Sequence, residues 1–153
     1  MFRIDDDLQE FLESGVAVHV GTATPDGRPR VTYAWGPRVQ GDRETIDVFL
    51  DTARCDGAIA DLRATGRIAM TVGHPVSYRS VQLKGVFEGI SEVDDADRAW
   101  VQRHREAFLV TTMLVGDPPD VIRNLWFEEV TRITFRADRA FDQTPGPDAG
   151  RPL

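Results

Sequence analysis

The sequence contains a single cysteine, Cys55, among its 153 residues, so no disulfide can form within the chain. A protein without structural disulfides is typical of a reducing cytoplasm. No apolar run approaches the roughly 20 residues that a membrane-spanning helix needs. The acidic start at residues 5–7 lacks the basic and apolar regions of a signal peptide. These absences predict a cytoplasmic protein that is not inserted in a membrane.

Positive charge and metal ligands are also scarce. The chain has 25 acidic and 18 basic residues, a net charge of −7, which disfavours a nucleic-acid backbone as the main partner. Among the basic residues only Lys84 is a lysine. His19, His74 and His104 are scattered without metal-ligand spacing, so no metal site is expected. His104 falls in an apolar helical stripe and is expected to be a packed helix residue.

What remains is the composition of an ordinary globular domain, with 41% hydrophobic and 28% charged residues. Apolar alternation predicts strands at 16–20, 30–36, 45–51, 67–72, 77–90 and 131–136. Helical spacing predicts helices at 5–14, 57–65 and 94–108, and a short one opens at 117–120. Turns rather than crossover helices join most strands. The fold class is therefore α+β, mainly β, with a six-stranded antiparallel sheet closed into a small barrel with peripheral helices.

The segment from Gly27 to Leu62 contains the clearest candidate for a ligand site. A strand ends at residue 51, and the polar turn at 52–57 leads directly into a helix. The first N–H groups of a helix have no partner inside it and suit an anion. Thr52 adds a hydroxyl group and Arg54 adds a fixed cation. The pattern predicts a phosphate seat beside a strand that carries two aromatic residues.

Four segments together resemble the pyridoxamine 5′-phosphate oxidase-like family of flavin-binding split β-barrels. They are GRPRVT at 27–32, VFLDT at 48–52, DLRATGRIAM at 61–70 and YRSVQLKG at 78–85. The likeness spans about residues 8–141, so a flavin-binding domain is expected at 1–141 and an irregular tail, rich in proline and glycine, at 142–153. The resemblance implies a homodimer that binds FMN or a related flavin in a cleft between its subunits.

The resemblance also implies which residues touch the cofactor. The strand residues Arg30, Val31, Thr32 and Tyr33 would lie along the isoalloxazine ring. Thr52 would supply a hydroxyl or backbone contact, Ser80 or Gln82 would touch the ring or phosphate side, and Trp126 would close the pocket. In the family a basic residue usually follows the threonine segment, but here Gly57 and Ala58 stand at those positions. Three other cations are candidates for that role: Arg54, Arg79 and Lys84.

Several candidates have a plainer interpretation. On a strand, Ser80, Gln82 and Lys84 point one way and Arg79, Val81 and Leu83 the other. The polar row is usual for a solvated face but also suits a dimer cleft, whereas Arg79 on an apolar face needs a partner. Tyr33 and Trp35 are expected first in the core and second in stacking on a flavin.

Three functions fit this pattern. The first is an FMN-dependent oxidoreductase acting on a small molecule, with no catalytic residue predicted because the ring performs the redox chemistry. The tail lacks the arginine and histidine cluster that a pyridoxal phosphate substrate would need. The second is a non-catalytic protein that binds a flavin, a deazaflavin or haem on the same barrel. The third is a dimeric scaffold without a cofactor.

Overall fold

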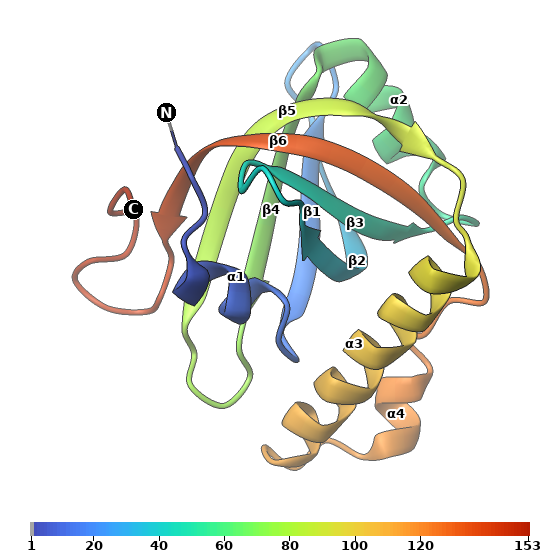
Figure 1. Ribbon diagram of the computed structural model, residues 1–153, viewed down its shortest axis with the longest axis vertical. Coiled ribbons are helices and arrows are strands. Elements are labelled where there is room, and N and C mark those ends of the chain that lie inside the picture. Colours follow the sequence, from blue (N-terminus) through green and yellow to red (C-terminus); the bar gives the residue numbers. More distant parts are fainter. Residues whose placement is uncertain (1) are drawn as a thin grey trace.

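Six antiparallel strands close into a barrel in the order β1-β2-β3-β6-β5-β4, with β4 pairing back to β1 (Figure 1). The computed structural model describes residues 2–153. Its strands are β1 (Ala17–Ala23), β2 (Pro29–Val39), β3 (Thr45–Asp51), β4 (Arg67–Gly73), β5 (Ser80–Ser91) and β6 (Val130–Asp142). Its helices are α1 (Asp6–Leu12), α2 (Asp56–Thr65), α3 (Asp95–Met113) and α4 (Pro119–Arg123). The predicted fold class is confirmed.

Apolar alternation builds the barrel core as predicted. Alternate residues of β1, β4 and β5 point inward, and Val20, Met70 and Leu83 are fully buried. The N-terminal helix covers one opening of this core. Asp5 caps it by accepting a hydrogen bond from the Leu8 N–H at 2.8 Å, as its acidic start predicts.

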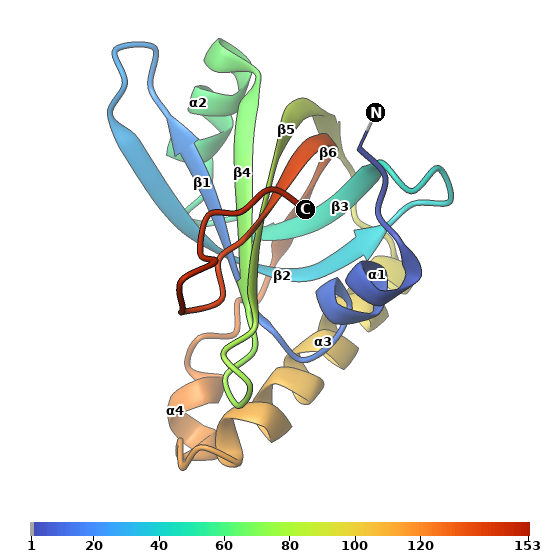
Figure 2. The same cartoon turned by 90° about the vertical axis from the view of Figure 1, so that its left-hand side faces the viewer.

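A second apolar cluster lies outside the barrel, between its wall and α3. It contains Trp35, Phe49, Val101, Phe108, Leu109 and Ile122. Both views place α2 at one end of the barrel and the α3–α4 pair at the other (Figures 1 and 2). No helix within residues 2–153 has the length and apolar character to cross a membrane.

A β-bulge in β2 provides the attachment point for α3. The register with β3 shifts between Trp35 and Arg38, and Gly36 adopts a φ of 57°, which favours glycine. The Gly36 N–H donates to His104 Nδ1 at 3.0 Å, and Trp100 Nε1 donates to the Gly36 carbonyl at 2.9 Å. Two side chains of α3 therefore bond both polar groups of Gly36.

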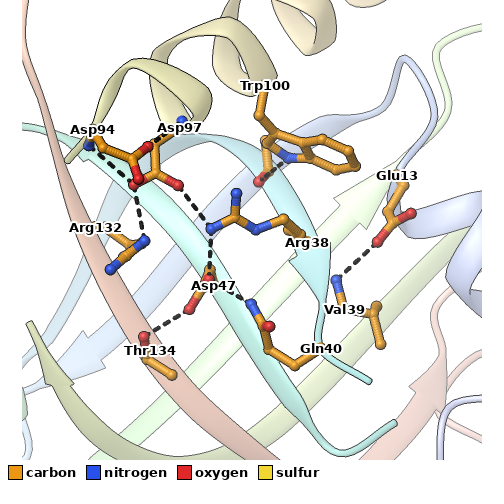
Figure 3. A network of polar contacts seen from close by, with 11 residues as sticks. Glu13, Arg38, Val39, Gln40, Asp47, Asp94, Asp97, Trp100, Arg132 and Thr134 are labelled. Carbon is orange, nitrogen blue, oxygen red and sulfur yellow. Dashed lines mark hydrogen bonds and ion pairs between the residues drawn. The ribbon is translucent and has the colours of Figure 1, made fainter. Parts of the chain in front are cut away.

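An ion network fixes the start of α3 to the barrel wall (Figure 3). Asp97, in the first turn of α3, accepts hydrogen bonds from Arg38 at 2.7 Å and from Arg132 at 2.8 Å. Arg38 also donates to Asp47 of β3 at 2.9 Å. The network joins α3 to β2, β3 and β6.

Some elements differ in extent from the prediction. Strand β5 begins at Ser80 rather than residue 77, and its expected bends appear as register shifts next to Gly85 and Gly89. Helix α3 continues to Met113 and β6 to Asp142, well beyond the predicted ends at 108 and 136.

The chain beyond β6 has no helix or strand but returns to the barrel. The Leu153 N–H donates to the Ala140 carbonyl at 3.0 Å, and a bridge joins Pro152 to Phe141. The pairing of β3 with β6 stops at Arg136, so this return covers part of an edge that would otherwise be open.

Candidate cofactor site

Arg30 places a cation at the first turn of α2. Its Nε donates to Asp61 at 2.9 Å, and Asp61 also accepts from the Thr22 hydroxyl at 2.8 Å. These hydrogen bonds lower the pKa of Asp61, which keeps its carboxylate ionised. A Cβ atom at Gly57 would lie only 2.5 Å from Arg30 Cζ. The guanidinium therefore fills the space that a side chain at position 57 would need.

Arg30 supplies the cation that the sequence lacks at position 57. The sequence indicated a missing cation at that position, but a cation reaches the same place from β2. Cys55, at the start of α2, makes no capping hydrogen bond through its side chain with the described residues, so the first N–H groups of the helix stay free. Arg30 keeps 45% of its side chain exposed and remains accessible to a ligand.

A basic groove runs along the barrel wall next to Arg30. This groove has a volume of about 390 Å³, and its cationic rim contains Arg30, Arg67, Lys84 and Arg139. Apolar residues also line the groove, among them Ile68 and Val31. Three of the cations pair with Asp61 or Asp138, whereas Lys84 forms no ion pair with residues 2–153 and lies 5.2 Å from the Phe141 ring.

Strand register explains how the basic groove gathers its charges. Lys84 of β5 is paired with Arg139 of β6 on one side and with Ala69 of β4 on the other. Gln82 lies two residues before Lys84 on the same side of β5, and its side chain donates to the Thr71 hydroxyl at 3.0 Å. Of the residues that line this groove, sequence reasoning proposed Arg30, Val31 and Lys84 but missed Arg67 and Arg139, since only the pairing of distant strands reveals them.

The second depression, here called the Trp126 cleft, lies where β3 leaves the barrel. It has a volume of about 480 Å³ and is lined by Thr52, Arg54, Trp126, Phe127 and neighbouring residues. The Thr52 hydroxyl lies 2.9 Å from that of Thr131, and the Thr52 N–H donates to the Glu129 carbonyl at 3.1 Å. Arg54 is 80% exposed, with its Nε 3.5 Å from Asp51. Three predicted cofactor residues thus share this cleft.

Arg79 and Ser80 lie apart from both depressions. Arg79 precedes β5, donates to Asp7 at 2.5 Å and lies over the Phe11 ring at 4.3 Å. The partner that Arg79 needs is therefore helix α1. The Ser80 N–H donates to the Thr144 hydroxyl at 3.1 Å, so the C-terminal segment covers it. Neither residue lines the basic groove or the Trp126 cleft.

The outer face of β2 is apolar and partly uncovered. Val31 is 70% exposed and Tyr33 is 54% exposed, with half-buried Thr32 between them. Tyr33 was expected first in the core, and that expectation is wrong, whereas Trp35 is buried as predicted. Both rings lie on the outer face, but the cluster beneath α3 includes only Trp35.

The histidines form no metal centre. Within residues 2–153 no group of three histidine, cysteine or acidic side chains is arranged to hold a metal ion. His104 is buried as predicted, and burial lowers its pKa to about 4. Its neutral ring accepts from Gly36 and, through Nε2, donates to the Val16 carbonyl at 3.1 Å.

Comparisons with known proteins agree with the barrel. The pyridoxamine 5′-phosphate oxidase family model matches residues 4–131. HupZ of Group A Streptococcus is 14% identical, with a TM-score of 0.59 over 96% of this chain and 99% of that one. An F420 reductase is 21% identical, with a TM-score of 0.57 over 90% and 98% of the two chains.

An FMN-binding protein from Syntrophomonas wolfei is 14% identical, with a TM-score of 0.54 over 90% of this chain and 87% of that one. At these identities the solved structures establish the fold alone. A search of curated proteins finds no match.

Proposed function

Since the chain belongs to the pyridoxamine 5′-phosphate oxidase family, we propose that it is an FMN-dependent oxidoreductase acting on a small molecule. The observation that carries the proposal is the Arg30 guanidinium held against Gly57 at the uncapped start of α2. A cation beside free helical N–H groups fits the phosphate of FMN. When bound, a flavin supplies hydride or electron-pair transfer, while the protein provides orientation, electrostatics and exclusion of water.

The residues divide into three roles under this proposal. Arg30 binds the phosphate at the start of α2, and Thr52 and Arg54 contact the cofactor from the Trp126 cleft. The exposed strip of Val31 and Tyr33 provides an apolar surface for the ring. Lys84 and Gln82 line the polar side, where a cation favours the negative charge of a reduced flavin.

We place the site between two copies of the chain. In one copy the candidate residues are divided between the basic groove and the Trp126 cleft, and the ring surface at Val31 and Tyr33 is open. A second copy laid on β2 would cover this strip and bring a second set of polar residues to it. A homodimer in the cytoplasm, with the cofactor at its interface, is the proposed functional form.

The test is a visible spectrum of the purified protein followed by FMN titration of matched variants. We expect flavin absorption bands in the wild type. Arg30→Met should weaken FMN binding about ten- to a hundredfold, since a charge-assisted hydrogen bond contributes roughly 1.5–3 kcal/mol. Arg54→Ala should also weaken it. Arg28→Met is the control, because Arg28 is 82% exposed in the preceding turn. Unchanged affinity in Arg30→Met would refute the phosphate seat.

A deazaflavin is the second candidate cofactor, and the basic groove favours it. Arg67 and Arg139 extend the cationic rim beyond what a single phosphate requires. Deazaflavin F420 has an extended anionic tail, which such a rim suits electrostatically. Parallel titrations with FMN and F420 separate the two, and a Soret band in the purified protein would instead indicate haem.

A further inference from the structure

Arg105 is a buried cation with almost none of its donors used. The residue is only 8% exposed. One terminal nitrogen donates to the Phe127 carbonyl at 2.9 Å, whereas its Nε is buried and finds no partner among residues 2–153. The guanidinium lies 5.4 Å from the Trp35 ring centroid and 5.9 Å from that of Phe127.

This arrangement is costly as a purely structural feature. Burial lowers the pKa of Arg105, and the negative charge of Asp51 acts on it only from a distance. Buried charges are normally paired with an opposite charge and fully hydrogen-bonded, and an arginine presents five N–H donors. One bond to a carbonyl uses a single donor. The unused donors leave Arg105 able to bind an acceptor from outside the chain.

Arg105 lines a surface depression together with other polar side chains of α3. The depression has a volume of about 320 Å³ and is here called the α3 pocket. Arg98, Gln102 and Arg105 line it at positions i, i+4 and i+7 of α3, which is one face of the helix. Glu128 and Glu129 line both the α3 pocket and the Trp126 cleft. The pocket therefore adjoins the proposed cofactor region.

We propose that the α3 pocket binds the carboxylate or phosphate group of a small molecule, with Arg105 deep in the site and Arg98 nearer the solvent. A planar guanidinium with free donors suits both oxyanions. The site itself does not require a flavin. Its identification as the seat for an anionic substrate group rests on the proposed oxidoreductase function.

The test uses the whole protein without added flavin. Inorganic phosphate and acetate are titrated separately at an ionic strength held constant with chloride. The readouts are tryptophan fluorescence, since Trp35 contacts Arg105, and the ¹⁵N resonance of Arg105 Nε. We expect a saturable response to at least one anion, and the anion that binds more tightly identifies the group. Arg105→Met should weaken anion binding at least tenfold. Glu129→Gln should strengthen anion binding, because it removes a negative charge that repels the anion.

Two control variants separate this pocket from other anion sites. Arg103→Met removes an arginine of the same helix that lies over Trp100, and should leave the affinity unchanged. Arg30→Met removes the proposed flavin phosphate seat and should also leave the response intact. A response that disappears in Arg30→Met but persists in Arg105→Met would overturn the proposal.

Stability measurements distinguish a binding role from a packing role. Arg105→Met should fold with an unchanged or raised melting temperature, because it removes an unpaired buried charge. If that variant fails to fold, two other measurements test whether Arg105 binds the anion. They are the anion titration of Arg105→Lys and the shift of the Arg105 Nε resonance in the wild type. Absence of a saturable wild-type response to both anions would refute the α3 pocket even if FMN binds. Loss of FMN binding with the anion response retained would instead refute the flavin function alone.

Discussion

At the scale of single residues, the position of the Arg30 guanidinium requires glycine at position 57. A methyl group at position 57 would occupy the place of the Arg30 guanidinium and displace it from Asp61. We therefore expect Gly57→Ala to weaken FMN binding about tenfold. The free energy of unfolding should fall by about 1–3 kcal/mol at most, because buried Asp61 loses its arginine but keeps the Thr22 hydroxyl, and alanine is favoured over glycine in a helix.

Flavin titration and urea denaturation of the same samples check this expectation. Gly41→Ala is the matched control, because a Cβ atom at Gly41 meets no atom of the described residues within 4 Å. Equal FMN affinity in Gly57→Ala and wild type would contradict the assigned role of Arg30.

His104 makes the stability of the fold depend on pH. Burial lowers its pKa to about 4 in the folded chain, from 6.5 in the unfolded one. Between these values the unfolded chain binds a proton that the folded chain does not, so stability is full above pH 6.5 and falls toward pH 4. The expected slope from this residue is about 1.4 kcal/mol per pH unit.

Urea unfolding from pH 7 to pH 4 measures this slope for wild type and His104→Gln. Glutamine can accept from Gly36 without titrating, so subtracting the two curves removes the contribution of the carboxylates. Parallel curves would show that His104 does not titrate in this range.

At the scale of elements, Asp97 is the centre of the ion network that helps to hold α3 on the barrel. Its side chain is only 2% exposed and accepts from two arginines. Asp97→Asn would leave both cations without their shared charge, so we expect a loss of about 3–5 kcal/mol of unfolding free energy. Asp95→Asn is a change of the same kind two residues earlier, on the exposed surface of α3, and should cost less than about 0.5 kcal/mol. Similar losses in the two variants would contradict the role of the network.

The elements most faithfully predicted are those with one solvent face and one core face. Val18, Val20, Ile68 and Met70 alternate with polar or small residues, and their strands form as expected. The predicted end of β6 was too early because Arg136, Asp138 and Arg139 look like a loop. Their side chains lie on the exposed barrel wall while Ala137 and Ala140 face inward.

The site could be predicted only in part, because the decisive contacts join residues far apart in the chain. The turn at Thr52 and Arg54, which is proposed to bind an anion, is local and was visible in the sequence. The Arg30–Asp61 pair spans 31 positions and depends on how α2 packs beside β2. Arg105 gave no signal, since an arginine in an amphipathic helix normally lies on its solvated face.

At the scale of the whole molecule, the exposed strip on β2 should be the dimer interface. Exposed apolar residues that lie together mark interaction surfaces. Val31→Glu changes a side chain that is 70% exposed, so the fold should persist while the dimer dissociates and FMN binding weakens. Light scattering at micromolar concentration gives the mass. Val121→Glu, on α4 and 56% exposed, is the control and should remain dimeric. A dimer that survives Val31→Glu but not Val121→Glu would place the interface on the helices.

A shared site also predicts complementation between two defective chains. If the basic groove of one copy meets the Trp126 cleft of its partner, a mixed dimer of Arg30→Met and Trp126→Ala chains contains one intact site. Random mixing makes half of the dimers mixed, so about a quarter of all sites should regain FMN affinity. Refolding the two variants together and titrating FMN measures this fraction. If both depressions serve the same chain, every site in the mixture carries one defect and no affinity returns, which would place the cofactor within a single subunit.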